Sequence, residues 1–100
     1  MGFIATYRWR VAAEAEPAFR ERWTEITRKA LQLGGLGSTL TRAENGEFVA
    51  IALWPDQQTR TDAFTQIEAG PPLAGVEFLE EVRLDVLEDL WTVSPFKASA

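Results

Sequence analysis

The residues of this 100-residue chain that could do chemistry are mainly large aromatic side chains. It contains four tryptophans and one tyrosine, but no histidine and no cysteine. Trp9, Trp23 and Trp54 could form walls that hold a flat ring. The phenol of Tyr7 could donate a hydrogen bond to an oxygen that gains negative charge. The aromatic content therefore indicates a candidate binding site for a small ring-shaped molecule.

The same aromatic side chains have a simpler interpretation as core. Trp23 and Phe19 lie on the apolar stripe of a predicted helix, so we interpret them first as core residues. For Tyr7, Trp9 and Trp54 both interpretations stay open, because a buried Tyr or Trp needs a polar partner and a pocket can supply one.

Several kinds of site are excluded by residue type. Without histidine or cysteine there is no Ser/His/Asp triad, thiolate nucleophile or thiolate metal site. The acidic residues between 77 and 89 lack the ordered oxygen-ligand spacing of a calcium loop, and we interpret them as a solvated face. The sequence GGLG at 34–37 lacks the lysine of a phosphate loop and is typical of a helix end. We predict no metal site.

The first half of the chain predicts a strand, a helix and a second strand. Residues 3–11 alternate between apolar and mostly polar positions, which is typical of a strand. A helix is predicted from about Pro17 to Gly34-Gly35, and its apolar residues recur every three or four positions. A strand over 36–42 and Asn45-Gly46, a strong hairpin signal, follow.

The second half begins with EFVAIALWPD at 47–56, which predicts a third strand from Phe48 to Trp54. Asp56 or Thr59 can cap a second helix that stops at residues 70–72. We expect a short helical turn within 73–81 and a fourth strand over 83–93, with a bulge near Glu88-Asp89. We predict that these elements form one domain over residues 1–94, with a loose tail over 95–100.

This element order predicts a ferredoxin-like βαββαβ fold of the α+β class, with a four-stranded antiparallel sheet. Right-handed crossovers place both helices on one face of the sheet. The third strand is apolar on both faces, so its other face also needs a cover. A second copy that packs sheet to sheet would supply it, and we predict a homodimer. Alternatively, the flanking strands and the tail shield this face.

Two arginines share the face of the first strand that would meet the partner. Arg8 and Arg10 are expected to pair with acidic residues such as Glu47 or Asp85 across the dimer, rather than to bind substrate.

Charge and hydropathy restrict the classes of partner. The net charge is −5, and the ten basic residues are scattered, so nucleic acids and anionic membranes are disfavoured. No run of eighteen apolar residues occurs, and Arg8 and Arg10 interrupt the N-terminal apolar stretch. A cytoplasmic location is the prediction.

Several short sequence motifs, each present once, follow one another in a characteristic order over nearly the whole chain. Together they resemble the antibiotic biosynthesis monooxygenase family, in particular its small bacterial members. The residues that carry the resemblance are YRWR at 7–10, Phe19, Trp23, LGSTLTR at 36–42, Asn45-Gly46 and AIALWPD at 50–56.

The resemblance implies a dimeric α+β barrel of two ferredoxin-like subunits, with a pocket in each subunit between sheet and helices. Family members include cofactor-free oxygenases of polyketide phenols, haem-degrading enzymes and proteins that act on quinones. The haem-degrading pattern relies on a histidine ligand, which this chain lacks. The resemblance therefore implies that no cofactor is used.

The cofactor-free members use Tyr, Trp, Asn and Arg side chains in the pocket. By element, Tyr7, Trp9, Trp54 and Arg42 are the nearest equivalents here, and no residue is assigned as catalytic. From its position at the hairpin end of the second strand, we interpret Arg42 as a solvated charge at the rim of the sheet.

Two functions compete at this point. The first is a cofactor-independent monooxygenase that acts on a small aromatic or polycyclic substrate in a dry, aromatic pocket of roughly a few hundred Å³. The second is a non-catalytic binding or stress-response protein on the same scaffold. An empty cavity with a convergent hydrogen-bond donor favours the first. A cavity filled by the chain's own side chains, or an open cavity without a convergent donor, favours the second.

Overall fold

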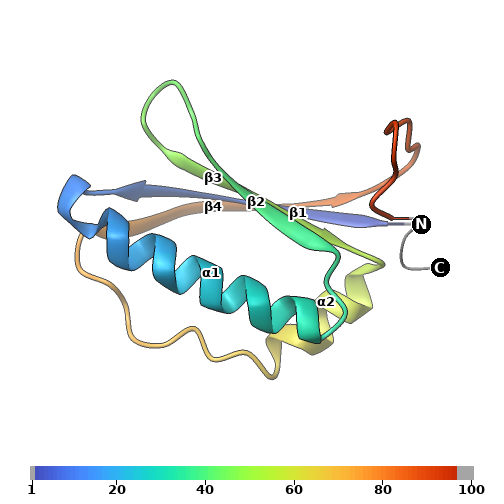
Figure 1. Ribbon diagram of the computed structural model, residues 1–100, viewed down its shortest axis with the longest axis horizontal. Helices are drawn as coiled ribbons and strands as arrows, with labels where there is room; N and C mark the ends of the chain where they lie inside the picture. The colour runs from blue at the N-terminus through green and yellow to red at the C-terminus, as the bar shows by residue number, and fades with distance from the viewer. Residues whose placement is uncertain (1, 97–100) are drawn as a thin grey trace.

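A computed structural model describes residues 2–96, which form a four-stranded antiparallel sheet with both α-helices on one side (Figure 1). The strand order is β2-β3-β1-β4. This arrangement confirms the predicted ferredoxin-like α+β fold. The elements are β1 (Phe3–Val11), the 3₁₀ helix η1 (Ala13–Ala15), α1 (Glu16–Gln32), β2 (Gly37–Arg42), β3 (Phe48–Trp54), α2 (Gln57–Phe64) and β4 (Val76–Asp85).

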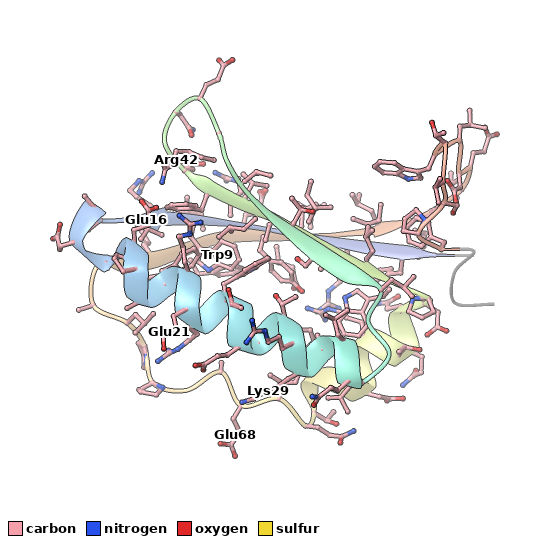
Figure 2. All side chains as sticks on the ribbon, in the orientation of Figure 1. Trp9, Glu16, Glu21, Lys29, Arg42 and Glu68 are labelled. Carbon is pink, nitrogen blue, oxygen red and sulfur yellow. The ribbon has the colours of Figure 1, made fainter. Side chains whose placement is uncertain are left out.

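The helix α1 begins and ends where its sequence signals predict. Pro17 occupies its first turn, Glu16 lies at the positive end of the dipole, and Lys29 lies in the last turn. Figure 2 shows Glu21 and Lys29 extending away from the sheet, as the apolar stripe requires. No helix within residues 2–96 is long and apolar enough to cross a membrane.

The central strands β1 and β3 pair from Phe3 opposite Trp54 to Trp9 opposite Phe48, and they bury one face of the sheet against the helices. Phe3 lies opposite Trp54, and Ala5 lies opposite Ala52. Because side chains alternate across a strand, these residues all point to the helices. Phe3, Ala5 and Trp54 form the core with Ala63 of α2.

The helix α2 is shorter than predicted. It begins after the predicted cap Asp56, whose carboxylate accepts a hydrogen bond of 2.7 Å from the backbone N–H of Thr59. It ends at Phe64 rather than at residues 70–72, so the prediction of a longer helix is wrong. The Thr65 hydroxyl donates to the carbonyl of Asp62, and this bond closes the last turn.

The boundaries predicted for the fourth strand are also wrong. β4 runs over Val76–Asp85, where a helical turn was expected, and residues 86–93 form no strand. The reason is long-range pairing: β4 pairs with β1 from Val11 opposite Val76 to Phe3 opposite Asp85. This pairing outweighs the local sequence, whose clustered glutamates disfavour a strand.

A bulge lies inside β4 instead of near residues 88–89. Arg8 pairs with Glu80 and Trp9 pairs with Phe78, so Leu79 is the extra residue on β4. A bulge changes which face the following side chains occupy. Here it places Phe78 on the helix-facing side, next to Trp9.

The other face of the sheet carries no helix of the described chain (Figure 1). By register, this face presents Ile51, Val82 and Leu84, whose exposed fractions are 38%, 38% and 44%. The segment 86–93 does not bury itself there, because its large apolar residues remain exposed. Shielding of this face by the chain's own tail is therefore not the arrangement in residues 2–96.

The end of the described chain returns to its beginning. The backbone N–H of Val86 donates to the carbonyl of Gly2, and the ring of Phe96 lies against Gly2 so closely that a Cβ there would come within 2.1 Å of it. The remainder of the predicted tail, residues 97–100, lies outside the described residues.

Candidate functional site

A cavity of about 450 Å³ lies between the sheet, α1 and the loop that joins α2 to β4. Its volume is within the usual range for small-molecule sites, and its walls are mainly apolar. Four of the five predicted site residues line it: Tyr7, Trp9, Trp23 and Trp54. The other lining residues that matter below are Phe19, Arg22, Phe64, Pro71 and Phe78.

The α1 wall of the cavity follows from the helical spacing of its apolar residues. Trp23, Ile26 and Ala30 lie on the face of α1 that meets the sheet, and all three line the cavity. Trp23 is half-buried, so it is a wall as well as a packing residue. Phe19, which is 5% exposed, fits the core interpretation better.

The floor of the cavity at β1 is a cluster of packed rings. Tyr7 and Trp9 stack with their ring centroids 5.9 Å apart. Trp9 packs edge-to-face with Phe19 and with Phe78, with ring centroids 5.1 Å and 6.1 Å apart. Figure 2 shows Trp9 between the sheet and α1. Because each ring is held by another, these walls are fixed before any ligand arrives.

Trp54 ends β3 at the opposite side of the cavity. It is 2% exposed and packs against Phe64 of α2, with ring centroids 6.0 Å apart. Its buried indole N–H has no hydrogen-bond partner within residues 2–96. Trp54 is therefore both core and cavity wall.

A buried polar cluster adjoins the cavity behind Tyr7. The Nη2 group of Arg60, on α2, donates to the Tyr7 hydroxyl at 3.0 Å and pairs with the Oε2 carboxylate oxygen of Glu81, on β4. Arg60 is 9% exposed, and its guanidinium lies over the ring of Phe64 at 4.9 Å. A buried guanidinium needs such partners to offset its loss of water.

Burial raises the pKa of the Tyr7 phenol above its ordinary 10.0. The hydrogen bond and the positive charge of Arg60 oppose this rise, and the nearby Glu81 adds to it. Tyr7 is therefore a neutral hydrogen-bond donor at neutral pH, not a phenolate base.

Arg60 and Glu81 are functional candidates that sequence reasoning missed. Glu81 lies opposite Tyr7 in the register of β1 and β4, a contact that could not be predicted while residues 73–81 were expected to form a helical turn. A signal for Arg60 does exist in the sequence: it precedes Ala63, Phe64 and Ile67 at helical spacing, so a charge lies on an apolar helix face.

Arg42, the fifth predicted site residue, does not line this cavity. It pairs with Glu16 of α1 at 2.7 Å, and its guanidinium lies over the ring of Phe48 at 4.8 Å. Figure 2 shows Arg42 at the hairpin end of the sheet near Glu16. This position agrees with the interpretation of Arg42 as a charge at the rim of the sheet. Arg42 contributes no side chain to the lining of the aromatic cavity.

The outer wall of the cavity is the loop from Ala69 to Leu73. The Nη1 group of Arg22 donates to the backbone carbonyl of Pro71 and so ties this loop to α1. Gly70 lies directly against the same guanidinium, where a Cβ would come within 3.3 Å of its central carbon. Its φ of +81° also favours glycine.

The arginines on the open face pair within the chain. Arg8 meets Glu47 at 2.5 Å and Arg10 meets Glu77 at 2.9 Å, so the expected pairing of Glu47 across a dimer is wrong. The hydrogen bond from Arg8 holds the pKa of the Glu47 carboxyl below its usual 4.5. Asp85 lies beside Phe3 in the β1–β4 register and so on the helix-facing side.

Metal binding has no support from clustered ligands. Within residues 2–96, no group of three or more acidic, histidine or cysteine side chains is arranged to hold a metal ion. The arrangement that is present provides aromatic walls suited to a flat apolar molecule, with Tyr7 among the residues that line them.

Solved structures of other proteins share the fold of this chain. SnoaB, a cofactor-independent oxygenase from Streptomyces nogalater, superimposes with a TM-score of 0.72 over 89% of this chain and 96% of its own, at 19% identity. The haem-degrading protein Rv3592 from Mycobacterium tuberculosis gives a TM-score of 0.67 over 91% of this chain and 100% of its own, at 18% identity.

A third structure, a putative antibiotic biosynthesis monooxygenase from Deinococcus radiodurans, gives a TM-score of 0.66 over 92% of this chain and 99% of its own, at 15% identity. No protein-family model and no curated protein sequence matches the chain. The chain thus has the fold of the antibiotic biosynthesis monooxygenases, as the sequence resemblance implied.

Proposed function

We propose that this protein is a cofactor-independent monooxygenase that acts on a small aromatic or polycyclic substrate in the cavity between sheet and α1. The observation that carries the proposal is the combination of an apolar, aromatic-lined cavity with the Tyr7 hydroxyl, which Arg60 holds at 3.0 Å. The oxygenase activity of SnoaB, which shares the fold, agrees with it.

In the proposed reaction the substrate itself reduces dioxygen. An enolate or phenolate is electron-rich enough to pass electrons to O₂; one oxygen atom then enters the ring system and the other leaves as water. The protein needs to stabilise the anion and exclude bulk water. Tyr7 would donate a hydrogen bond to the anionic oxygen, and the tryptophan walls would hold the ring.

A cytoplasmic homodimer completes the proposal. The open face of the sheet leaves Ile51, Val82 and Leu84 between 38% and 44% exposed, and covering the exposed part of each would contribute roughly 0.6–1.3 kcal/mol. A second copy packed sheet to sheet covers these residues in both subunits at once. The cavity lies on the other side of the sheet and stays accessible.

Oxygen consumption in the presence of anthrones and hydroquinones tests the activity. We expect uptake that is lost or strongly reduced in Trp23→Ala, which removes one wall. Trp91→Phe is the matched control, because Trp91 does not line the cavity and is 62% exposed. No uptake with any compound of the panel would contradict the proposal.

Binding and catalysis can be separated in the same variants. In Trp91→Phe the remaining tryptophans, Trp9, Trp23 and Trp54, all line the cavity and report on its contents by fluorescence. Saturable quenching without oxygen uptake would replace the proposed enzyme by a non-catalytic binding protein.

A further inference from the structure

A row of small side chains crosses the helix-facing side of the sheet. Ala52 of β3 pairs with Ala5 of β1 on one side and with Ser38 of β2 on the other. Residues directly opposite each other in paired strands point to the same face, so these three side chains form one row at right angles to the strands. Ala52 and Ser38 line the cavity. The floor of the cavity is therefore lowered along this row.

Large side chains stand on both sides of the row. Trp54 follows Ala52 by two residues on β3, and Tyr7 follows Ala5 by two residues on β1, so both point to the same face as the row. Leu40 continues the Tyr7 side on β2. A strand rises about 3.3 Å per residue, which puts each flanking row about 7 Å away. The row is thus a slot about as wide as one side chain.

The slot is closed at β1 and open at β2. Ala5 is 0% exposed and packs in the core with Ala63 of α2. At the other end β2 is the edge strand, and Gly37 lines the cavity there. A Cβ on Gly37 would meet no atom of residues 2–96 within 4 Å, its chain neighbours aside. Leu31 of α1 also lines the cavity, although it is 48% exposed. The cavity therefore reaches the surface at the β2 edge, beside an apolar side chain.

The shape of this slot fits an unbranched aliphatic chain. Its accessible floor is Ala52 and Ser38, so it offers no charge, and its open end sets no limit on length. Each methylene that leaves water there would raise affinity about fourfold. A branched group is wider than the slot and would collide with the flanking side chains of Trp54 or Leu40.

Resting on the function proposed above, we propose that the cavity takes a substrate that carries an unbranched aliphatic chain on its flat ring. The ring lies among Tyr7, Trp9 and Trp23. The chain lies over Ala52 and leaves the protein at the β2 edge. Ala52 and Ser38 determine specificity, because their small size keeps the slot open.

Two isomeric probes test the shape of the slot: 2-butylnaphthalene and 2-tert-butylnaphthalene, which have the same atoms and the same ring and differ only in branching. Affinities are measured by tryptophan fluorescence in the Trp91→Phe background. We expect the unbranched isomer to bind roughly four- to fifteenfold more tightly, the contribution of one or two methylenes that the compact isomer cannot bury in the slot.

A larger side chain in the row should abolish this preference. In Ala52→Leu the ratio of the two affinities should fall to about one, because leucine fills the slot. The affinity for naphthalene itself should change less than about twofold, because the ring lies elsewhere. Ala18→Leu is the matched control, since Ala18 is exposed on α1 and does not line the cavity, and it should keep the ratio. If Ala52→Leu does not fold, Ser38→Leu blocks the same slot from the edge strand.

The outcomes separate this inference from the proposed function. Equal or reversed affinities for the two isomers in the Trp91→Phe protein, or a preference that persists in the folded slot variant, would overturn the slot while the cavity remains a ligand site. Absence of saturable binding by naphthalene and by both isomers would contradict the proposed function itself.

Discussion

The two faces of β3 carry equally apolar side chains but have different surroundings. On the face toward the helices, Ala50 and Trp54 are 1% and 2% exposed. On the other face, Ile51 is 38% exposed. Hydrophobicity alone does not separate these residues; what separates them is whether the same chain provides a cover.

The polar groups of the two faces differ in the same way. Behind the cavity, Arg60 is buried with Tyr7 and Glu81, so its pairing is needed to avoid an uncompensated charge. At the rim of the open face, Arg10 is 63% exposed beside Glu77, and such a pair contributes little. The helix-facing side of the sheet holds the candidate site, and the open side is the proposed dimer surface.

The largest expected effect comes from the buried face. Trp54→Ala removes a side chain that is 2% exposed and should lower the free energy of unfolding by about 3–5 kcal/mol. Ile51→Ala, three residues earlier on the open face, should lose less than half as much when measured on dilute protein. Denaturant unfolding compares them, and equal losses would show that the two faces are equally covered.

A charge on the open face should break the proposed dimer. Ile51→Asp would bury a carboxylate between the two sheets, so we expect sedimentation velocity to show a single 11.2-kDa chain. Thr61→Asp, on an exposed position of α2, adds the same charge on the other side and should leave the dimer intact. An unaltered protein that already sediments as one chain at micromolar concentration would contradict sheet-to-sheet packing.

The smallest expected effects are on the pH dependence of stability, which should differ between the two faces of the sheet. The pKa of Tyr7 is raised from 10.0, so the stability due to its protonated phenol is present below pH 10.0 and is lost as pH rises through the folded-state pKa. The pKa of Glu47 is lowered from 4.5, so its contribution is present above pH 4.5 and is lost as pH falls through the folded-state pKa.

Substitution should remove each pH dependence separately. Tyr7→Phe should flatten the alkaline decline in unfolding free energy, and Glu47→Gln should flatten part of the acid decline. Thermal unfolding across pH gives both curves. If Tyr7→Phe changed the acid decline instead, or Glu47→Gln changed the alkaline decline, the assignment of these two pH dependences to the two faces would be contradicted.

The parts of the fold that could be predicted from sequence are those with local signals. The alternation of β1, the stripe and Pro17 of α1, and Asn45-Gly46 each follow from backbone geometry within a few residues. β4 has no such signal, because its place is set by pairing with β1 about seventy residues away.

The candidate site was predictable to the same extent. Tyr7, Trp9, Trp23 and Trp54 could be identified from residue type and element, and the structure brings them together around one cavity. Arg60 and Glu81 meet only because α2 and β4 converge on Tyr7, and that convergence depends on the register of β4.

The tie between Arg22 and Pro71 bears on how a molecule enters the cavity. Two consecutive prolines in this loop have no backbone N–H to offer, so a side chain of α1 supplies the anchor. Release of one guanidinium could swing the loop outward while every strand stays paired. A ligand would then enter and leave the cavity without any disturbance of the proposed dimer surface.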